Sequence, residues 1–291
     1  MAVIARVVAD PALSGWDGFG LAIQAYQKRA EKVIDFVVDL AEAHRRRFMV
    51  RLVKGAYWDT EIKRAQERGL DDYPVFTRKA MTDLNYLACA HQLLAQRSRI
   101  FPQFATHNAM TVAHIVHEAG GTNGYEFQRL HGMGEALYAS LRELQPGIAC
   151  RTYAPVGQHR DLLAYLVRRL LENGANSSFV SVAADPNVPI EQLVTSETEI
   201  VGKAEAARHP HIPRPRALYG PARQNSRGVE LGHHASLTAL QAEIARAGAA
   251  PAVAAPIIDG KPQDGPSRQL ASPFDPGVVA GAVVEADVAT A

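Results

Sequence analysis

Short apolar runs and longer amphipathic stretches alternate along the first two thirds of the chain. The apolar runs predict strands at Leu21–Ala25, Phe48–Val53, Ile100–Ala105, Tyr125–Leu130 and Cys150–Ala154. Between them the pattern predicts helices at Tyr26–Arg47, Trp58–Arg68, Thr77–Leu94, Met110–Glu118, Glu135–Leu144 and Asp161–Glu172. Pro102 predicts a distorted start of the third strand. Regular alternation of strand and helix indicates an α/β domain whose parallel sheet is either open and doubly wound or closed into a barrel.

The pattern changes beyond about Glu191. Pro213, Pro215, scattered glycines and the alanine-rich stretch Ala245–Ala255 predict a linker-like, irregular segment. Short β-branched runs follow around Gly277 and Gly281. We therefore expect a boundary that separates residues 1–193 from residues 194–291.

Composition narrows the class of protein. The 291 residues are 47% hydrophobic and 21% charged, with a formal net charge of +1, which is typical of a soluble globular protein. This balance gives no electrostatic reason to expect a nucleic-acid-binding segment. We find no apolar stretch of the roughly 18 residues that a membrane span needs and no signal-peptide pattern. With only Cys89 and Cys150, we expect a reducing, cytoplasmic setting.

Polar residues follow the predicted strands, where the loops of a parallel sheet face one common crevice. They include Gln24, Arg51, Lys54, Thr106–Asn108, Gln128, His131 and Tyr153, and the same strand ends also carry Gly55–Trp58 and Leu130. Arg51 lies inside an apolar strand, so it is either an outward or ion-paired arginine or a guanidinium that meets an electron-rich ring or phosphate. His107 is either functional or incidental to a helix-capping turn.

The predicted helix Asp161–Glu172 carries a second candidate site. Tyr165, Arg168, Arg169 and Glu172 are spaced by three or four and share one face. Two adjacent arginines suit a small carboxylate, but the pattern alone slightly favours an exposed Arg–Glu pair.

Two further motifs do not support a site. Gly132–Gly134 lacks the third glycine of a dinucleotide fingerprint. His114 and His117 lack a carboxylate at metalloprotease spacing, so we expect no metal centre.

Several segments in a fixed order resemble the proline dehydrogenase family, and more narrowly the bacterial bifunctional proline utilization A flavoenzymes. They are Gln24–Arg29, Arg51–Asp59, Thr77–Lys79, Phe104–Asn108, Tyr125–Glu135 and Tyr165–Phe179. The resemblance covers about Pro11–Val194. It implies a (β/α)8 TIM-type barrel that binds FAD and oxidises L-proline to Δ1-pyrroline-5-carboxylate, with electrons passing to a membrane quinone.

The resemblance also implies residue roles. Cofactor contacts would come from Gln24, Arg51, Lys54, Gly55, Ala56, Tyr57, Trp58, Thr77, Arg78, Lys79, Thr106, His107, Asn108, Gln128, Leu130, Glu172 and Phe179. Within this set Arg51 would lie near the flavin N5, and residues 77–79 and 106–108 would meet the ADP portion. Arg168 and Arg169 would bind the proline carboxylate, with Tyr153 and Tyr165 packing on the proline ring.

The family's barrel has eight strands, and the five predicted here would be the fourth to the eighth. Ile212–Ala291 resembles the connection to an aldehyde dehydrogenase domain and its first strands, whose NAD site would lie further on. We therefore expect a piece of a longer bifunctional enzyme, cytoplasmic and with a possible peripheral contact with the inner membrane.

Two alternatives stay open at this point. The chain by itself could be a non-catalytic remnant that does not bind FAD, because an open barrel exposes unpaired strand edges. An unrelated barrel enzyme acting on a phosphorylated substrate would have to explain the paired arginines Arg168 and Arg169.

Overall fold

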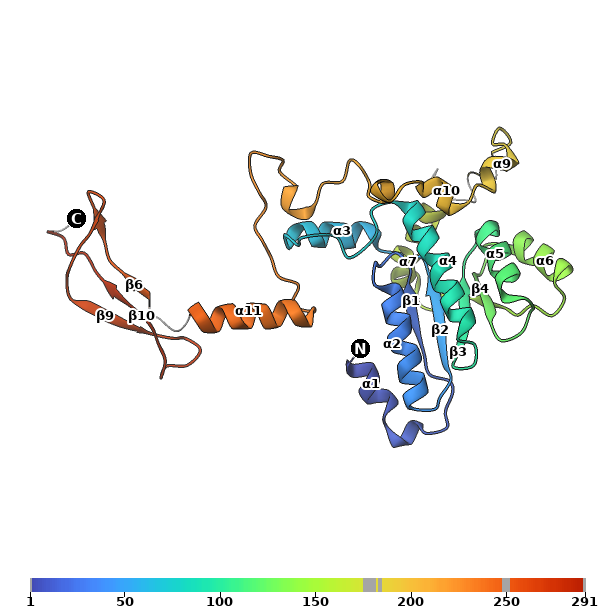
Figure 1. Cartoon of the computed structure of the whole chain (residues 1–291), viewed down its shortest axis with the longest axis horizontal. Helices are drawn as coiled ribbons and strands as arrows, with labels where there is room; N and C mark the ends of the chain where they lie inside the picture. Colours follow the sequence, from blue (N-terminus) through green and yellow to red (C-terminus); the bar gives the residue numbers. More distant parts are fainter. Residues whose placement is uncertain (1, 175–181, 183–184, 248–251, 290–291) are drawn as a thin grey trace. The chain divides into compact units, whose positions relative to one another are not determined.

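The computed structural model describes residues 2–174, 182, 185–247 and 252–289, with the backbone alone for residues 170–174 (Figure 1). The chain forms two units. The first contains residues 1–67 and 71–225, and the second contains residues 68–70 and 226–291.

A five-stranded parallel sheet forms the centre of the first unit. Its strands are β1 (Gly20–Gln24), β2 (Phe48–Val53), β3 (Ile100–Ala105), β4 (Glu126–Leu130) and β5 (Cys150–Tyr153). They pair in chain order, β1-β2-β3-β4-β5, without a reversal. In a doubly wound sheet the order of the strands reverses at a switch point. The parallel α/β prediction is therefore confirmed, and these five strands do not follow the doubly wound alternative.

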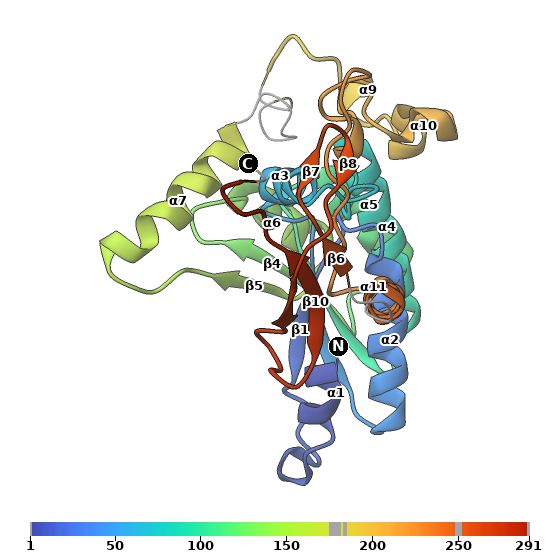
Figure 2. The same cartoon turned by 90° about the vertical axis from the view of Figure 1, so that its left-hand side faces the viewer.

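Helices alternate with the strands. They are α1 (Ala2–Val8), α2 (Ala30–Ala43), α3 (Trp58–Glu67), α4 (Lys79–Ala95), α5 (Ala109–Ala119), α6 (Glu135–Leu144) and α7 (His159–Gly174). A short 3₁₀ turn, η1 (Pro11–Leu13), precedes β1. When successive strands are added at the same edge of a parallel sheet, right-handed crossovers place the connecting helices on one face of that sheet. Figure 2 shows α2 and α4 together on one side of the sheet and α7 on the other.

Two local predictions need correction. Helix α2 begins at Ala30 rather than Tyr26, because the backbone of Tyr26 is bonded to Lys54 and Phe76 in neighbouring segments. Pro102 does not distort β3, which keeps an unbroken register with β2. Pairing of β3 with β4 starts only at Gln103, so the missing N–H of Pro102 falls outside that ladder.

The helix-covered face of the sheet holds the core. Alternate strand residues such as Phe48, Val50, Leu52 and Phe104 are completely buried against the helices. Phe127 of β4 joins this layer, with its ring centroid 5.8 Å from that of Tyr138 and 6.1 Å from that of Phe104. Because side chains alternate in a strand, the intervening residues project from the opposite face.

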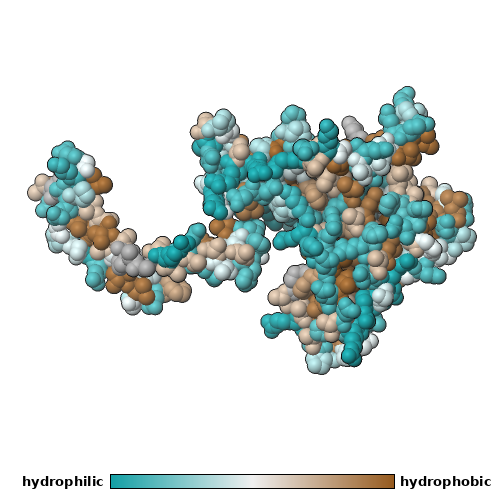
Figure 3. Space-filling model, viewed as in Figure 1, coloured by the Kyte–Doolittle hydropathy of each residue, from teal (hydrophilic) through white to brown (hydrophobic). Residues whose placement is uncertain are grey.

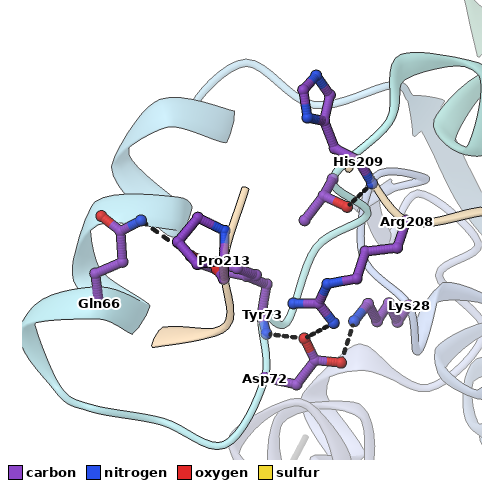
Figure 4. Close-up of polar contacts among 8 residues, drawn as sticks. Lys28, Gln66, Asp72, Tyr73, Arg208, His209 and Pro213 are labelled. Carbon is purple, nitrogen blue, oxygen red and sulfur yellow. Dashed lines mark hydrogen bonds and ion pairs between the residues drawn. The ribbon is translucent and has the colours of Figure 1, made fainter. Parts of the chain in front are cut away.

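The last part of the first unit packs back on earlier residues. It contains α9 (Ile190–Leu193), α10 (Glu197–Val201), and the 3₁₀ turns η2 (Ala204–Ala207) and η3 (Pro215–Ala217). Figure 4 shows its anchors. Asp72 accepts from Lys28 at 2.9 Å and from Arg208 at 3.1 Å, and the Tyr73 hydroxyl donates to the Pro213 carbonyl at 2.8 Å.

The second unit consists of one helix and small sheets. They are α11 (His234–Ala247), β6 (Ala252–Ala254), β7 (Ile257–Ile258), β8 (Lys261–Pro262), β9 (Ser267–Ala271) and β10 (Val279–Val284). The prediction of irregular structure is wrong for α11, a regular helix in which Leu237, Leu240 and Ile244 are spaced by three and four and no residue is buried. Hydrophobic residues are exposed over the small sheet, among them Val253 and Leu270 (Figure 3). A Cβ at Gly281 would lie 2.4 Å from the Ala252 carbonyl, so glycine permits the β6–β10 pairing.

Candidate active site at the carboxyl ends of the strands

Arg51 projects from β2 on the face opposite the apolar core. Its Nε donates to Oε1 of Gln128 at 2.8 Å, and its guanidinium lies 4.6 Å from the centre of the Tyr153 ring. Its partners among the described residues are therefore an amide and an aromatic ring rather than a carboxylate. Burial raises the pKa of Tyr153, and the charges of Arg51 and Arg169 oppose that rise. Arg169 of α7 thus lies within electrostatic reach of Arg51's ring partner.

Glu126 is the centre of a polar network on the same face. Its Oε1 accepts from Nε2 of Gln128 at 2.9 Å and from Nε2 of Gln103 at 2.8 Å. Arg151 makes a two-pronged contact with both carboxylate oxygens, at 2.9 and 3.0 Å. Burial alone would raise the pKa of Glu126, but these donors outweigh it and hold that pKa below its ordinary value.

Two lysines share one carboxylate at the end of β2. Asp83 of α4 binds Nζ of Lys54 through one oxygen and Nζ of Lys79 through the other, the latter at 2.6 Å. Burial lowers the pKa of Lys54 even though Asp83 acts in the opposite direction. The trio carries one net positive charge, because two ammonium groups face a single carboxylate.

The loop from β3 to α5 places a neutral histidine beside a helix N-terminus. Burial lowers the pKa of His107 to about 4, and the charges of Arg129 and Arg169 act in the same direction. The backbone N–H of Leu130 donates to Nε2 of His107 at 3.2 Å, so the ring proton is on Nδ1. Asn108 caps α5 by accepting from the N–H of Thr111 at 3.1 Å. This end of α5 is suited to an anionic group.

Thr106 supports the same turn in two ways. Its hydroxyl accepts from the backbone N–H of Asn108 at 3.2 Å, and its carbonyl accepts from the Tyr138 hydroxyl at 2.8 Å. The first contact shapes the loop that carries His107, and the second holds that loop against α6.

Helix α7 contributes the paired arginines. The Arg168 guanidinium lies 4.1 Å from the centre of the Tyr57 ring, donates to the Ala56 carbonyl and pairs with Asp59 at 3.0 Å. The Arg169 guanidinium lies 5.2 Å from the centre of the Tyr165 ring. Arg168 therefore contacts the loop after β2, whereas Arg169 faces the tyrosine on its own helix.

The loop after β2 is fixed by close packing. Gly55 has a φ of 130°, and a Cβ there would lie 2.4 Å from the Tyr26 ring. The indole N–H of Trp58 donates to the Phe76 carbonyl at 2.7 Å. Gln24, at the end of β1, is aligned in register with Val53 and so lies next to this loop.

Two of the candidate side chains after this loop contact the protein itself. The hydroxyl of Thr77 accepts from the N–H of His209 at 2.9 Å. Arg78 donates to the carbonyls of Ile200, Val201 and Ala206 at the end of α10 and in η2. Their expected contact with a cofactor stays a prediction. Phe179 and the side chain of Glu172 lie outside the described residues.

Comparison with known proteins decides the family. A family model described as "Proline dehydrogenase" matches residues 1–182. The chain belongs to the proline dehydrogenase family. "Bifunctional protein PutA" of Salmonella typhimurium is 48% identical over 292 residues, which cover 96% of this chain and 22% of that protein.

Solved structures of this proline dehydrogenase family agree. A crystal structure of a mutant proline utilization A (PutA) from Bradyrhizobium japonicum is 67% identical, with a TM-score of 0.80 over 84% of this chain and 25% of that one. The PutA structure from Bdellovibrio bacteriovorus is 30% identical, with a TM-score of 0.79 over 97% of this chain and 29% of that one. The chain thus spans less than a third of the length of these relatives.

The sequence analysis missed Glu126, Gln103 and Asp83. Glu126 lies between the aromatic residues Tyr125 and Phe127 in a strand interpreted as apolar. One signal was present: Glu126 and Gln128 are two residues apart and share a strand face with each other. Asp83 lies on the same helix as Lys79, four residues later, a spacing typical of ion pairs. For Gln103 we find no sequence signal beyond its polarity.

Proposed function

We propose that this chain takes part in the FAD-dependent oxidation of L-proline to Δ1-pyrroline-5-carboxylate. Family membership supports a dehydrogenase acting on proline. The observation that carries the proposal is the placement of Arg51 between Gln128 and the Tyr153 ring, a ring that also lies within electrostatic reach of Arg169. One guanidinium is thereby available to an electron-rich ring and another to a small carboxylate.

The donor set fits a cofactor that carries phosphates and an electron-rich ring. Lys54 and Lys79 supply ammonium groups, and the end of α5 near His107 supplies backbone N–H groups. FAD, when bound, supplies the acceptor for a hydride, which carries both of the electrons removed from proline. The Arg51 charge favours an electron-rich neighbour, and the partial burial of this side chain strengthens that effect.

Arg168 and Arg169 are proposed to hold the proline carboxylate. Two adjacent guanidinium groups fix a carboxylate in one orientation and so orient the ring that it carries. Asp59 now binds Arg168 at 3.0 Å, and the proposal implies that the substrate carboxylate replaces the Asp59 carboxylate there. The Asp59 side chain is 74% exposed, so water can readily solvate it after the exchange.

The proposed wider organisation follows the same resemblance. The one-way order of β1–β5 supports a place as the fourth to eighth strands of a (β/α)8 barrel. Residues 194–291 would form the connection to, and the start of, an aldehyde dehydrogenase domain that uses NAD. Transfer of electrons to a quinone would require a peripheral membrane contact from the cytoplasm. Among the described helices, none combines the length and apolarity needed to cross a bilayer.

The test is an absorbance spectrum of the protein after incubation with FAD and removal of free flavin. We expect retained flavin that bleaches when L-proline is added without oxygen. The PutA in the Bdellovibrio bacteriovorus structure was inactivated by N-propargylglycine, so the same compound should abolish the bleaching here. Retained flavin that proline does not reduce would contradict the proposed substrate. Absence of retained flavin would favour the alternative that this chain is a non-catalytic part.

A matched pair of arginine variants sharpens the assignment. Arg51→Met keeps the length and apolar stem of the side chain but removes its charge and donors, and we expect flavin to bind at least about tenfold more weakly. Arg160→Met makes the same change at an exposed position of α7. Equal flavin binding by the two variants would count against the role of Arg51.

A further inference from the structure

Gln128 lies between two groups of opposite hydrogen-bonding character. On one side the Glu126 carboxylate accepts from the Gln128 amide nitrogen at 2.9 Å. On the other side Arg51, which can only donate, gives its Nε–H to the Gln128 amide oxygen at 2.8 Å. Only one orientation of the amide satisfies both neighbours. Rotation by 180° would place the amide oxygen against a carboxylate and the amide nitrogen against a guanidinium.

Glu126 is itself held in place. It is 5% exposed, and besides Gln128 it accepts from Gln103 and from two nitrogens of Arg151. These donors keep the carboxylate ionised, since they hold its pKa below the ordinary value. An ionised carboxylate accepts but cannot donate, so it imposes one orientation on Gln128.

The consequence reaches Arg51. Its Nε–H is committed to Gln128 and its guanidinium is stacked on the Tyr153 ring. These two contacts, one through Nε and one with the aromatic ring, fix the direction of the side chain. Only its Nη groups can then be offered to a ligand.

We propose that Glu126 is a positioning residue that acts through Gln128 to set the orientation of the Arg51 guanidinium toward the flavin. The inference rests on the proposed function for the identity of the ligand, but the orientation of Arg51 itself can be tested without flavin. In this scheme Glu126 contacts neither flavin nor proline. Its effect depends on the direction of two hydrogen bonds: Arg51 donates to the Gln128 amide, and that amide donates to the Glu126 carboxylate.

The experiment compares Glu126→Gln with the double variant Glu126→Gln/Gln128→Glu. A glutamine at position 126 both donates and accepts, so the Gln128 amide is no longer held in one orientation. In the double variant the amide at position 126 donates to the carboxylate at position 128. That carboxylate accepts from Arg51, so each hydrogen bond again has a defined donor and acceptor. The net charge of the double variant equals that of the wild type. Packing volume is nearly the same in all three proteins.

The first measurement is hydrogen exchange at the Arg51 Nε–H, followed by NMR with ¹⁵N-labelled arginine. The signal is assigned by its absence in Arg51→Lys. We expect exchange about tenfold faster in Glu126→Gln and recovery to within about twofold of the wild type in the double variant, as for loss and return of one charge-assisted hydrogen bond. Glu118→Gln, on the helix-covered side, should leave the signal unchanged.

The second measurement is the dissociation constant of FAD. We expect it to rise severalfold in Glu126→Gln and to recover in the double variant. An Arg51 signal unchanged by Glu126→Gln, or not restored in a folded double variant, would overturn the proposal. A wild-type protein that binds no FAD would instead contradict the proposed function, and the exchange measurement would still decide the role of Glu126.

Discussion

The two faces of the five-stranded sheet carry different side chains from the same strands. On the helix-covered face, β2 and β4 present Leu52 and Phe127, which are completely buried. On the opposite face the same strands present Arg51 and Gln128, which bind each other. Because the side-chain period of a strand is two, one face can change its chemistry without disturbing the packing of the other. The comparison separates residues that stabilise the fold from residues that arrange the site.

The largest effect is expected on the apolar face. Phe127→Ala should lower the free energy of unfolding by about 3–5 kcal/mol, because it leaves a cavity among the rings of Phe104, Tyr125 and Tyr138. Urea denaturation followed by circular dichroism measures the change. The same substitution at Phe274, which is 97% exposed, should change it by less than about 0.5 kcal/mol.

Charges at the carboxyl end of β2 should come next. Asp83→Asn removes the shared partner of Lys54 and Lys79 and should lower the free energy of unfolding by about 3 kcal/mol, since Lys54 would keep a partly buried charge. The control is Asp35→Asn, whose partner Lys32 is 85% exposed, with an expected change below about 1 kcal/mol. Equal losses in the two variants would erase the distinction between site and surface charges.

A pH effect follows from His107. Its pKa is about 4 in the folded protein and about 6.5 in the unfolded chain, so between these values the unfolded state binds more protons. The free energy of unfolding should therefore fall by about 2 kcal/mol from this group when the pH drops from about 7 to about 5. His107→Gln should remove that part of the pH dependence. Urea denaturation at both pH values gives the comparison.

The smallest effect is expected on the polar face. Gln103→Leu removes one donor to Glu126 but leaves Gln128 and Arg151 in place, so the free energy of unfolding should change by less than about 1 kcal/mol. Gln103→Glu should be worse, because it sets a second carboxylate beside Glu126. A loss for Gln103→Leu as large as that for Phe127→Ala would mean that both faces stabilise the fold alike.

Sequence pattern predicted the sheet more closely than the site. The bounds of β2 and β3 agree with the predicted runs to the residue, because each is a short, mainly apolar run whose positions alternate between buried and half-buried. Helix α11 was missed although Leu237, Leu240 and Ile244 have helical spacing, because the prolines, glycines and alanines around it favoured an irregular segment. A short helical spacing of apolar residues is easily overlooked beside residues that favour turns and linkers.

The site was predicted residue by residue but not as a network. Arg51 was identified because an arginine is unusual in an apolar strand. Glu126, which reaches Arg51 only through Gln128, was not identified. Two of its partners are distant in the chain: Gln103 lies 23 residues away and Arg151 lies 25 residues away. Asp83 was not predicted for the same reason, since it lies 29 residues from its partner Lys54. Contacts of this kind exist only after the strands have paired.

The return of residues 208–213 to residues 72–77 has a consequence for the order of folding. Each strand of the sheet pairs with its neighbours in the chain, so the sheet can grow from β1 to β5 while the polypeptide is still being synthesised. The contacts of Arg208, His209 and Pro213 instead close loops of 136, 132 and 140 residues. Loop closure of that length carries an entropic penalty that nearby contacts avoid. We therefore expect residues 208–213 to dock last. A nascent chain that ends before this segment should be cut by proteases in the loop around Tyr73.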